Sequence, residues 1–172
     1  MTDQTTSPLP NFTRYITTHN NAGQSIIHSQ TTSSFHPFIQ DQVFFYVPYT
    51  TSEFPPNLNH EHDVTEYAKT LARGDLGPVT PNGTVWRVVD IAPGMSGPPD
   101  PWLGSQSLDF AVVLEGEIEL VLDSGERQRV HRGDLVVQRA TRHKWWNPSK
   151  TEWTRMVQLN LPWISSGKLD IP

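Results

Sequence analysis

The sequence contains no cysteine among its 172 residues. This absence excludes disulfides, thiolate nucleophiles and thiolate metal ligands, so any metal ion would need histidine and carboxylate ligands. Blocks of consecutive lysine or arginine residues are also missing, and the formal net charge is -5. Such a chain lacks the positive surface that a nucleic acid or an anionic membrane requires, and we expect neither as a partner.

Long apolar runs are absent too. No stretch approaches the roughly 18 apolar residues of a membrane-spanning helix, and residues 1–12 lack the charged start and the apolar centre of a signal peptide. We therefore expect a cytoplasmic protein. The sequence also has no glycine-rich phosphate-binding loop, and we expect no cofactor.

What the sequence does contain is typical of one globular domain built from short elements. A chain of this length buries one core, and its 15 prolines and 11 glycines indicate frequent turns. Residues 1–10 are polar and contain proline, which predicts a flexible tail. We expect a single domain over residues 11–172.

The first third of this domain is predicted to contain three strands. Alternation over residues 12–29, around a turn at residues 20–23, predicts a β-hairpin. A further strand is expected over residues 42–49, before a proline-rich stretch breaks the pattern.

One short helix is predicted over residues 64–73. Asp63 is the expected N-cap, with Glu66 three residues later as a variant of the capping box. Gly74 is expected to end the helix.

From Thr84 onward the chain consists of short alternating segments separated by turn residues. The predicted strands are TVWRVVDIA, DFAVVLEG, EIELVLDS, RQRVHR, DLVVQR and WTRMVQLNL. Several short strands at this spacing predict an antiparallel sandwich or barrel, and therefore an all-β fold.

Residues 97–147 carry two spaced motifs that resemble the signature motifs of the cupin superfamily. The first has the form G-x5-H-x-H-x3-E-x6-G, in which two His and one Glu ligate a metal. Counted from Gly97, Leu103 and Ser105 occupy the two His positions, Asp109 the Glu position and Gly116 the closing glycine. The spacing is kept while all three ligand residues are changed.

The second motif supplies a fourth ligand after a Gly-Asp turn. Here Gly133-Asp134 form the turn, His143 takes the ligand position and Asn147 follows it, while Gln138 stands where many cupins have proline. The resemblance implies a single cupin barrel (a double-stranded β-helix or jelly roll), with its core at about residues 84–161, preceded by N-terminal strands and one short helix. It also implies a homodimer, because additional N-terminal strands in cupins commonly pair across a two-fold axis.

The residues at these positions argue against the family's usual metal site. Leu103 has no donor atom, and the Ser105 hydroxyl competes poorly with water for a first-row metal. Asp109 and His143 remain, and two donors rarely hold a metal, so we predict a metal-free site. The alternative that a histidine from the N-terminal region completes a metal site remains open, whereas the His60-Glu61-His62 stretch is expected to be a solvated loop.

Asp109 and His143 are therefore the candidate catalytic residues. Facing one another across the barrel, they could serve as general base and general acid; the alternative is a buried hydrogen-bonded pair that only supports the barrel. The expected substrate-binding residues are Leu103, Ser105, Trp102, Arg87, Gln138, Trp145, Gln158 and Asn160.

Orientation is open for several of these residues. Met156, Gln158 and Asn160 share one face of the last strand, and the alternation does not decide whether that face lines the barrel. Arg87 alternates with Trp86, so one of the two points inward; an inward Arg87 would bind a carboxylate or enolate. The tryptophans predict aromatic walls for a flat ligand, or else ordinary packing.

Three functions are compatible with this pattern. The first is a metal-independent enzyme that dehydrates, isomerises or cyclises a hydrophobic polyketide- or terpenoid-like intermediate by proton transfer. The second is a metal-dependent oxidoreductase or oxygenase, the label given to similar small cupins of bacterial genomes and fungal natural-product clusters. The third is a ligand-binding module without catalysis. We expect the first, with a hydrophobic small-molecule substrate.

Overall fold

The computed structural model describes residues 7–39, 42–74, 76–77, 79–95, 103–104 and 107–162, with backbone only at 103–104. The strands in chain order are β1 Thr13–His19, β2 Ser25–Thr32, β3 His36–Ile39, β4 Val43–Thr50, β5 Val85–Ile91, β6 Leu103–Gly104, β7 Ser107–Glu115, β8 Glu117–Leu122, β9 Arg127–His131, β10 Leu135–Arg139, β11 Arg142–Trp146 and β12 Thr154–Pro162. A short 3-10 turn, Asn59–Glu61, leads into the helix α1, His62–Arg73.

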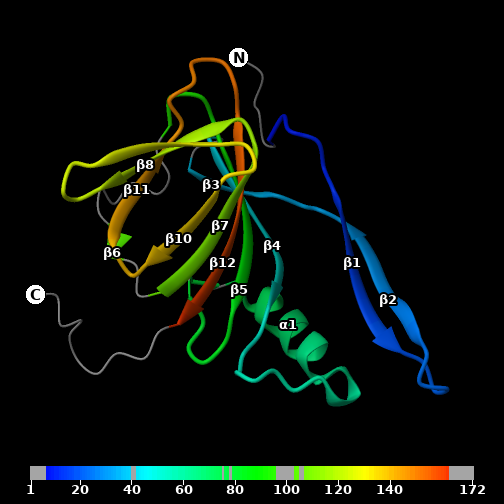
Figure 1. Ribbon diagram of the computed structural model, residues 1–172. Coiled ribbons are helices and arrows are strands. Elements are labelled where there is room, and N and C mark those ends of the chain that lie inside the picture. Colours follow the sequence, from blue (N-terminus) through cyan, green and yellow to red (C-terminus); the bar gives the residue numbers. More distant parts are fainter. Residues whose placement is uncertain are drawn as a thin grey trace, which may run out of the picture.

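Two antiparallel sheets face each other and form the body of the molecule (Figure 1). The larger sheet has the strand order β10-β7-β12-β5-β4-β3, and the smaller has the order β6-β11-β8-β9. The β1–β2 hairpin is a separate two-stranded sheet that extends beside this body, and α1 lies near the lower ends of β4 and β5 in the view of Figure 1. The all-β cupin fold predicted from the sequence is thereby confirmed, and none of the described helices is long and apolar enough to cross a membrane.

Most of the strands follow the predicted alternation. The N-terminal hairpin, the strand after Gln42 and all six strands predicted beyond Thr84 are present, with small differences at their ends. Three short strands, β3, β6 and β11, were not predicted. In β11 the inward side chains are His143 and Trp145, so an alternation of buried and less buried residues exists, but a buried histidine among Arg and Lys disguises it as a polar segment.

The predicted start of the helix is wrong. The helix α1 begins at His62, its N-cap is Glu61 with a φ of 56°, and no side chain caps it. Asp63 lies inside the first turn, where its carboxylate accepts a hydrogen bond from the Tyr49 hydroxyl at 2.6 Å. Tertiary contact with β4 therefore takes the carboxylate that the sequence suggested as a cap, whereas Gly74 ends the helix as predicted, with a φ of 71°.

The core fills the space between the two sheets. Its buried side chains are Val43, Val89, Ile91, Ala111, Val113, Ile118, Val130, Trp145 and Met156. Met156 lies in this core, so the face of β12 that also carries Gln158 and Asn160 is the inner face. This settles the orientation that the alternation alone left open.

Gly116, the closing glycine of the first motif, forms the turn between β7 and β8. Its φ is 70°, and a Cβ atom there would lie 2.6 Å from the carbonyl oxygen of Trp153. Only glycine fits this position without displacing backbone. The glycine is therefore required for the close approach of this turn to the residue before β12.

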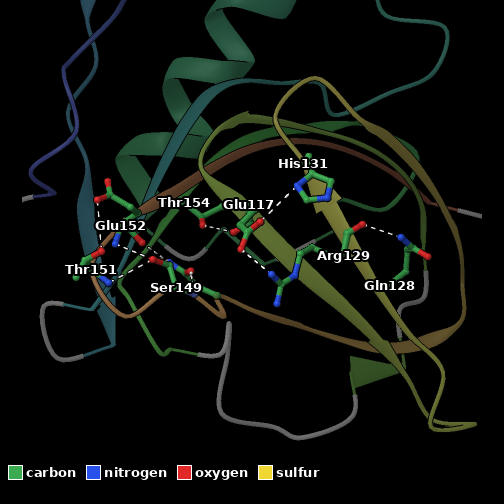
Figure 2. Close-up of polar contacts among 9 residues, drawn as sticks. Glu117, Gln128, Arg129, His131, Ser149, Thr151, Glu152 and Thr154 are labelled. Atoms are coloured by element: carbon green, nitrogen blue, oxygen red, sulfur yellow. Dashed lines mark hydrogen bonds and ion pairs between the residues drawn. The ribbon is translucent and has the colours of Figure 1, made fainter.

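Next to this turn, Glu117 is the centre of a small surface ion-pair cluster. Figure 2 shows Arg129 and His131 of β9 directed toward its carboxylate, at 3.2 and 3.3 Å respectively. The Glu117 carbonyl accepts the Thr154 hydroxyl at 2.5 Å, which ties β8 to β12. His131 is exposed and pairs with Glu117 at the surface.

The outer face of the larger sheet is partly covered by the N-terminal segment. Arg155 of β12 and Asp90 of β5 form a buried ion pair there, and Arg155 Nη1 also donates to the carbonyl of Pro10 at 2.6 Å. Residues 1–6 of the predicted tail lie outside the described residues. Pro10, at the end of that tail, makes a defined contact with the body.

Candidate functional site

Polar residues form a row across the inner face of the larger sheet. Gln138 of β10 pairs in register with Asp109 of β7, and Asp109 pairs with Asn160 of β12. Gln158 of β12 in turn pairs with Arg87 of β5. The row thus crosses four neighbouring strands on the side that faces the smaller sheet, and it contains five of the residues that the sequence assigned to the site.

Asp109 lies near the middle of this row and is 6% exposed. Its Oδ1 accepts a hydrogen bond from Asn160 Nδ2 at 2.7 Å. A carboxylate taken out of water needs such donors, because an uncompensated buried charge is costly. Asn160 therefore supplies a hydrogen-bond donor to Asp109 and orients one of its oxygens.

His143 faces this row from β11 of the smaller sheet and is also 6% exposed. Its Nδ1 lies 2.9 Å from Gln138 Nε2 and 3.1 Å from the carbonyl oxygen of Thr141. If Nδ1 carries the proton it donates to Thr141; if it does not, it accepts from the amide of Gln138. Both hydrogen bonds to described residues use Nδ1, so the protein fixes the ring through one nitrogen.

Burial lowers the pKa of His143, because a charged imidazolium is disfavoured away from water, while the Thr141 carbonyl and the nearby Asp109 carboxylate oppose that shift. The ring is therefore neutral at pH 7. The interaction with Asp109 also places the two candidate catalytic groups within electrostatic range of each other.

Gln138 connects the two sheets at this point. It is 3% exposed, and its Nε2 donates to the Thr141 carbonyl at 2.6 Å and contacts the Thr141 hydroxyl as well as His143. Thr141 was missed by the sequence reading. A hydroxyl residue two positions before a motif histidine, in the turn that precedes its strand, is the signal that could have indicated it.

Arg87 also points inward, toward Phe45 of β4. Its guanidinium lies 5.1 Å from the centre of the Phe45 ring, and Nη2 donates to the carbonyl of Gly77 at 2.7 Å. Its Nε is buried and has no hydrogen-bond partner within the described part of the chain. Burial lowers the pKa of this guanidinium, and the Asp109 carboxylate opposes that shift.

Trp145 lies two residues beyond His143 on the same face of β11. It is 7% exposed, belongs to the core, and its ring meets the His143 ring edge-on at 5.8 Å between centroids. Its Nε1 is buried without a hydrogen-bond partner among the residues that the structure describes. Gln158 Nε2 lies 3.8 Å from the Met156 sulfur, and a thioether is a weak hydrogen-bond acceptor.

Part of the predicted site lies outside the described residues: Gly97, Trp102, Ser105 and the side chain of Leu103. The backbone of Leu103 is described, and it pairs with His143 between β6 and β11. The two motifs, which are 40 residues apart at these positions, are therefore neighbours in the smaller sheet. For Trp102 and Ser105 the substrate-binding role stays a prediction.

The donor set does not fit a resident metal ion. Within the described ranges no group of three or more His, Asp or Glu side chains could hold one. Of the motif positions, Asp109 and His143 supply donors, and His143 already uses Nδ1 for Gln138 and Thr141. Among the N-terminal histidines, His28 lies 3.4 Å from Glu61, beside the helix and away from the row. No chemical step below is routed through a metal.

Comparison with known proteins gives a consistent assignment. Residues 87–157 match the model of the cupin domain. The chain is 38% identical over 160 residues to the Phomopsin biosynthesis cluster protein D of Diaporthe leptostromiformis, covering 91% of this chain and 82% of that protein. It is 35% identical to the Oryzines biosynthesis cluster protein J of Aspergillus oryzae, covering 93% and 89% respectively.

A third relative is the Cupin-domain-containing oxidoreductase fogC of Aspergillus ruber, with 37% identity over 81% of this chain and 66% of that protein. Two of these relatives match nearly the whole chain. The sequence motifs, the two facing sheets and the relatives agree, and the chain belongs to the cupin family.

Proposed function

We propose that the protein is a metal-independent enzyme of secondary metabolism that dehydrates, isomerises or cyclises a hydrophobic polyketide- or terpenoid-like intermediate by proton transfer and substrate shaping. One observation carries the proposal: a buried carboxylate, Asp109, and a buried neutral imidazole, His143, face each other from the two sheets. The named biosynthetic clusters of the relatives support the metabolic setting.

The geometry favours His143 as the base. With its proton on Nδ1, donated to Thr141, the ring presents the Nε2 lone pair to a substrate. The lowered pKa keeps that lone pair available at neutral pH. When Nε2 takes a proton from the substrate, the Asp109 carboxylate stabilises the resulting imidazolium, which then returns the proton at a neighbouring atom or to a leaving hydroxyl. This assignment exchanges the two roles expected from the sequence.

The test is turnover by the purified protein, in EDTA, of intermediates that accumulate when the gene is deleted. Asp109→Asn and His143→Gln should each lower turnover by about two to four orders of magnitude. Arg139→Gln, an exposed change on β10, is the matched control and should leave turnover unchanged. Full activity of Asp109→Asn would reject the proton-transfer role.

The relatives named as oxidoreductases favour a second candidate, a metal-dependent reaction. Metal analysis of protein purified without chelators separates the two. Stoichiometric Fe, Mn or Zn, together with loss of turnover in EDTA, would establish that candidate instead. Saturable binding of the same intermediates without any turnover would establish a binding module.

We also propose that the protein is a homodimer whose interface is the outer face of β10, β7, β12 and β5. Five large apolar side chains are exposed there: Leu135, Val137, Phe110, Leu114 and Trp86. Val137 pairs in register with Phe110, and Leu159 lies between Phe110 and Trp86. Monomeric proteins rarely expose so continuous an apolar surface. A second copy is the fitting occupant because none of these five side chains is charged, so two identical clusters meet without charge repulsion in a two-fold contact.

Light scattering at about 10 μM, a concentration at which a stable dimer with nanomolar affinity persists, should give twice the mass of the 19.5 kDa chain. Leu135→Lys combined with Val137→Lys should give a monomer of unchanged circular dichroism. A wild-type monomer under these conditions, or a dimer that survives both substitutions, would contradict the proposed interface.

A further inference from the structure

The guanidinium of Arg87 is incompletely satisfied by the residues around it. Among the described residues it has one hydrogen bond, from Nη2 to the Gly77 carbonyl, and it lies over the face of Phe45. Its Nε is enclosed without an acceptor within the described residues. A buried donor left without an acceptor is disfavoured, and native proteins keep few of them.

The charges near Arg87 do not supply that acceptor. Asp109 is within electrostatic range, but no hydrogen bond or ion pair joins it to Arg87 in the described part of the structure, and its Oδ1 is bound by Asn160. The register partner across the sheet, Gln158, has its amide nitrogen toward the Met156 sulfur. The guanidinium therefore has an edge, at Nε, that is buried without an acceptor among the described residues and lies within electrostatic range of Asp109.

The surroundings of that edge are aromatic and apolar. Phe45 packs against the core and covers one face of the guanidinium, and the inner face continues into the apolar core. The planar guanidinium can donate two parallel hydrogen bonds to a planar oxyanion such as a carboxylate. A flat apolar group attached to that oxyanion would pack against the apolar residues around Arg87.

We propose that Arg87 binds an oxyanion of the substrate, and that the substrate is an acid: a carboxylate or enolate attached to a flat, conjugated apolar body. The inference deepens the proposed function, and it rests on that function only in placing the ligand on the inner polar row. One negative charge is the fitting number, because the Asp109 carboxylate beside the site disfavours a second.

The chemistry of such a substrate is consistent with the neighbouring pair. An arginine that holds a carboxylate or enolate oxygen stabilises negative charge that builds up when a proton leaves the adjacent carbon. His143 takes that proton, and returning it at a different carbon completes an isomerisation with no gain or loss of electrons. No oxidant is needed.

The test uses two probes of the same shape, cinnamate and the neutral cinnamamide. Binding is measured by isothermal titration at pH 7.5 in EDTA, where a carboxylic acid is ionised. Wild-type protein should bind cinnamate at least tenfold more tightly than cinnamamide, and the Arg87 Nε–H signal in nitrogen–proton NMR spectra should shift on addition of cinnamate only.

Arg87→Met should remove the preference, leaving both probes with equal affinity, and Arg87→Lys should retain part of it. Arg139→Met, at an exposed arginine on β10 of the same sheet, should leave the preference unchanged. Unfolding midpoints equal to that of the wild type verify that each variant is folded.

Equal affinity of the two probes for the wild type, persistence of the preference in Arg87→Met, or no cinnamate binding up to about 10 mM would each overturn the inference. Because binding is measured without turnover, its failure is distinguishable from failure of the proposed function. If Asp109→Asn retains full activity, the proton-transfer role is rejected, but a cinnamate preference that depends on Arg87 still supports the binding inference. If cinnamate does not bind, the binding inference is rejected, but loss of activity in Asp109→Asn still supports the proton-transfer role.

Discussion

Two arginines on neighbouring strands of the larger sheet, Arg155 of β12 and Arg87 of β5, have opposite surroundings. Arg155 makes two hydrogen bonds of 2.6 Å to the carboxylate of Asp90 and a third to Pro10. Its guanidinium also lies 5.4 and 4.8 Å from the ring centres of Phe12 and Phe35. Within the described part of the chain, Arg87 donates one hydrogen bond, to the Gly77 carbonyl, and lies over one aromatic ring, that of Phe45.

The difference separates a structural cation from one available to a ligand. On the outer face every contact of Arg155 is supplied by the chain itself, and the pair ties the N-terminal segment to the sheet. On the inner face the described residues supply fewer hydrogen-bond acceptors than the Arg87 guanidinium has N–H donors. Incomplete pairing of a buried cation is tolerated where a ligand completes it, which supports the proposal that Arg87 binds a ligand on the inner face.

The largest effect on stability is expected from breaking the Arg155–Asp90 ion pair. Arg155→Met leaves the Asp90 carboxylate, which is 0% exposed, without its cation, and should lower the free energy of unfolding by about 3–5 kcal/mol in urea denaturation. Combining Arg155→Met with Asp90→Leu should restore much of that loss, since no charge is then stranded. A single substitution that costs less than about 1 kcal/mol would mean that the pair is not a structural element.

A smaller effect, dependent on pH, is expected for the inner site. Because burial lowers the pKa of His143 below its ordinary value of 6.5, the folded state favours the neutral ring. Its contribution to stability is therefore present above pH 6.5 and is lost as the pH falls through the lowered pKa of the folded state. The stability difference between wild type and His143→Gln should shrink between pH 7.5 and pH 5, measured by urea unfolding.

His131→Gln is the control for this titration, because His131 is exposed on the surface beside Glu117. The stability difference between His131→Gln and wild type should change less between pH 7.5 and pH 5. A stability difference for His143→Gln that grows on acidification would contradict a ring held neutral by burial.

The smallest effect on stability is expected from Arg87 itself. Arg87→Met should change the free energy of unfolding by less than about 1 kcal/mol in either direction, because no carboxylate is bound to this guanidinium by a hydrogen bond in the described residues and none is left stranded. The same urea titration as for Arg155→Met makes the comparison direct. Equal losses for the two variants would remove the distinction between the two arginines.

Much of the site could be predicted from the sequence. The spacing of the two motifs identified Asp109 and His143, and the structure places both in the barrel interior with Gln138 and Asn160 beside them. The contacts that define their chemistry could not be predicted. Gln138 reaches His143 and Thr141 because β10 and β11 belong to different sheets that meet at this point, and nothing in the local pattern of either strand encodes that meeting.

The sequence by itself determined most of the strands, the turn glycines and the pair of candidate catalytic residues, because the alternation of side chains and the motif spacing are local properties of the chain. Only the tertiary structure decided which face of each strand became the interior. Arg87 and Arg155 both stand among apolar residues of a strand, and the sequence treats them alike. Their different partners come from segments far away in the chain, Gly77 and Phe45 for one, Asp90 and Pro10 for the other, and such partners exist only once the sheets have packed.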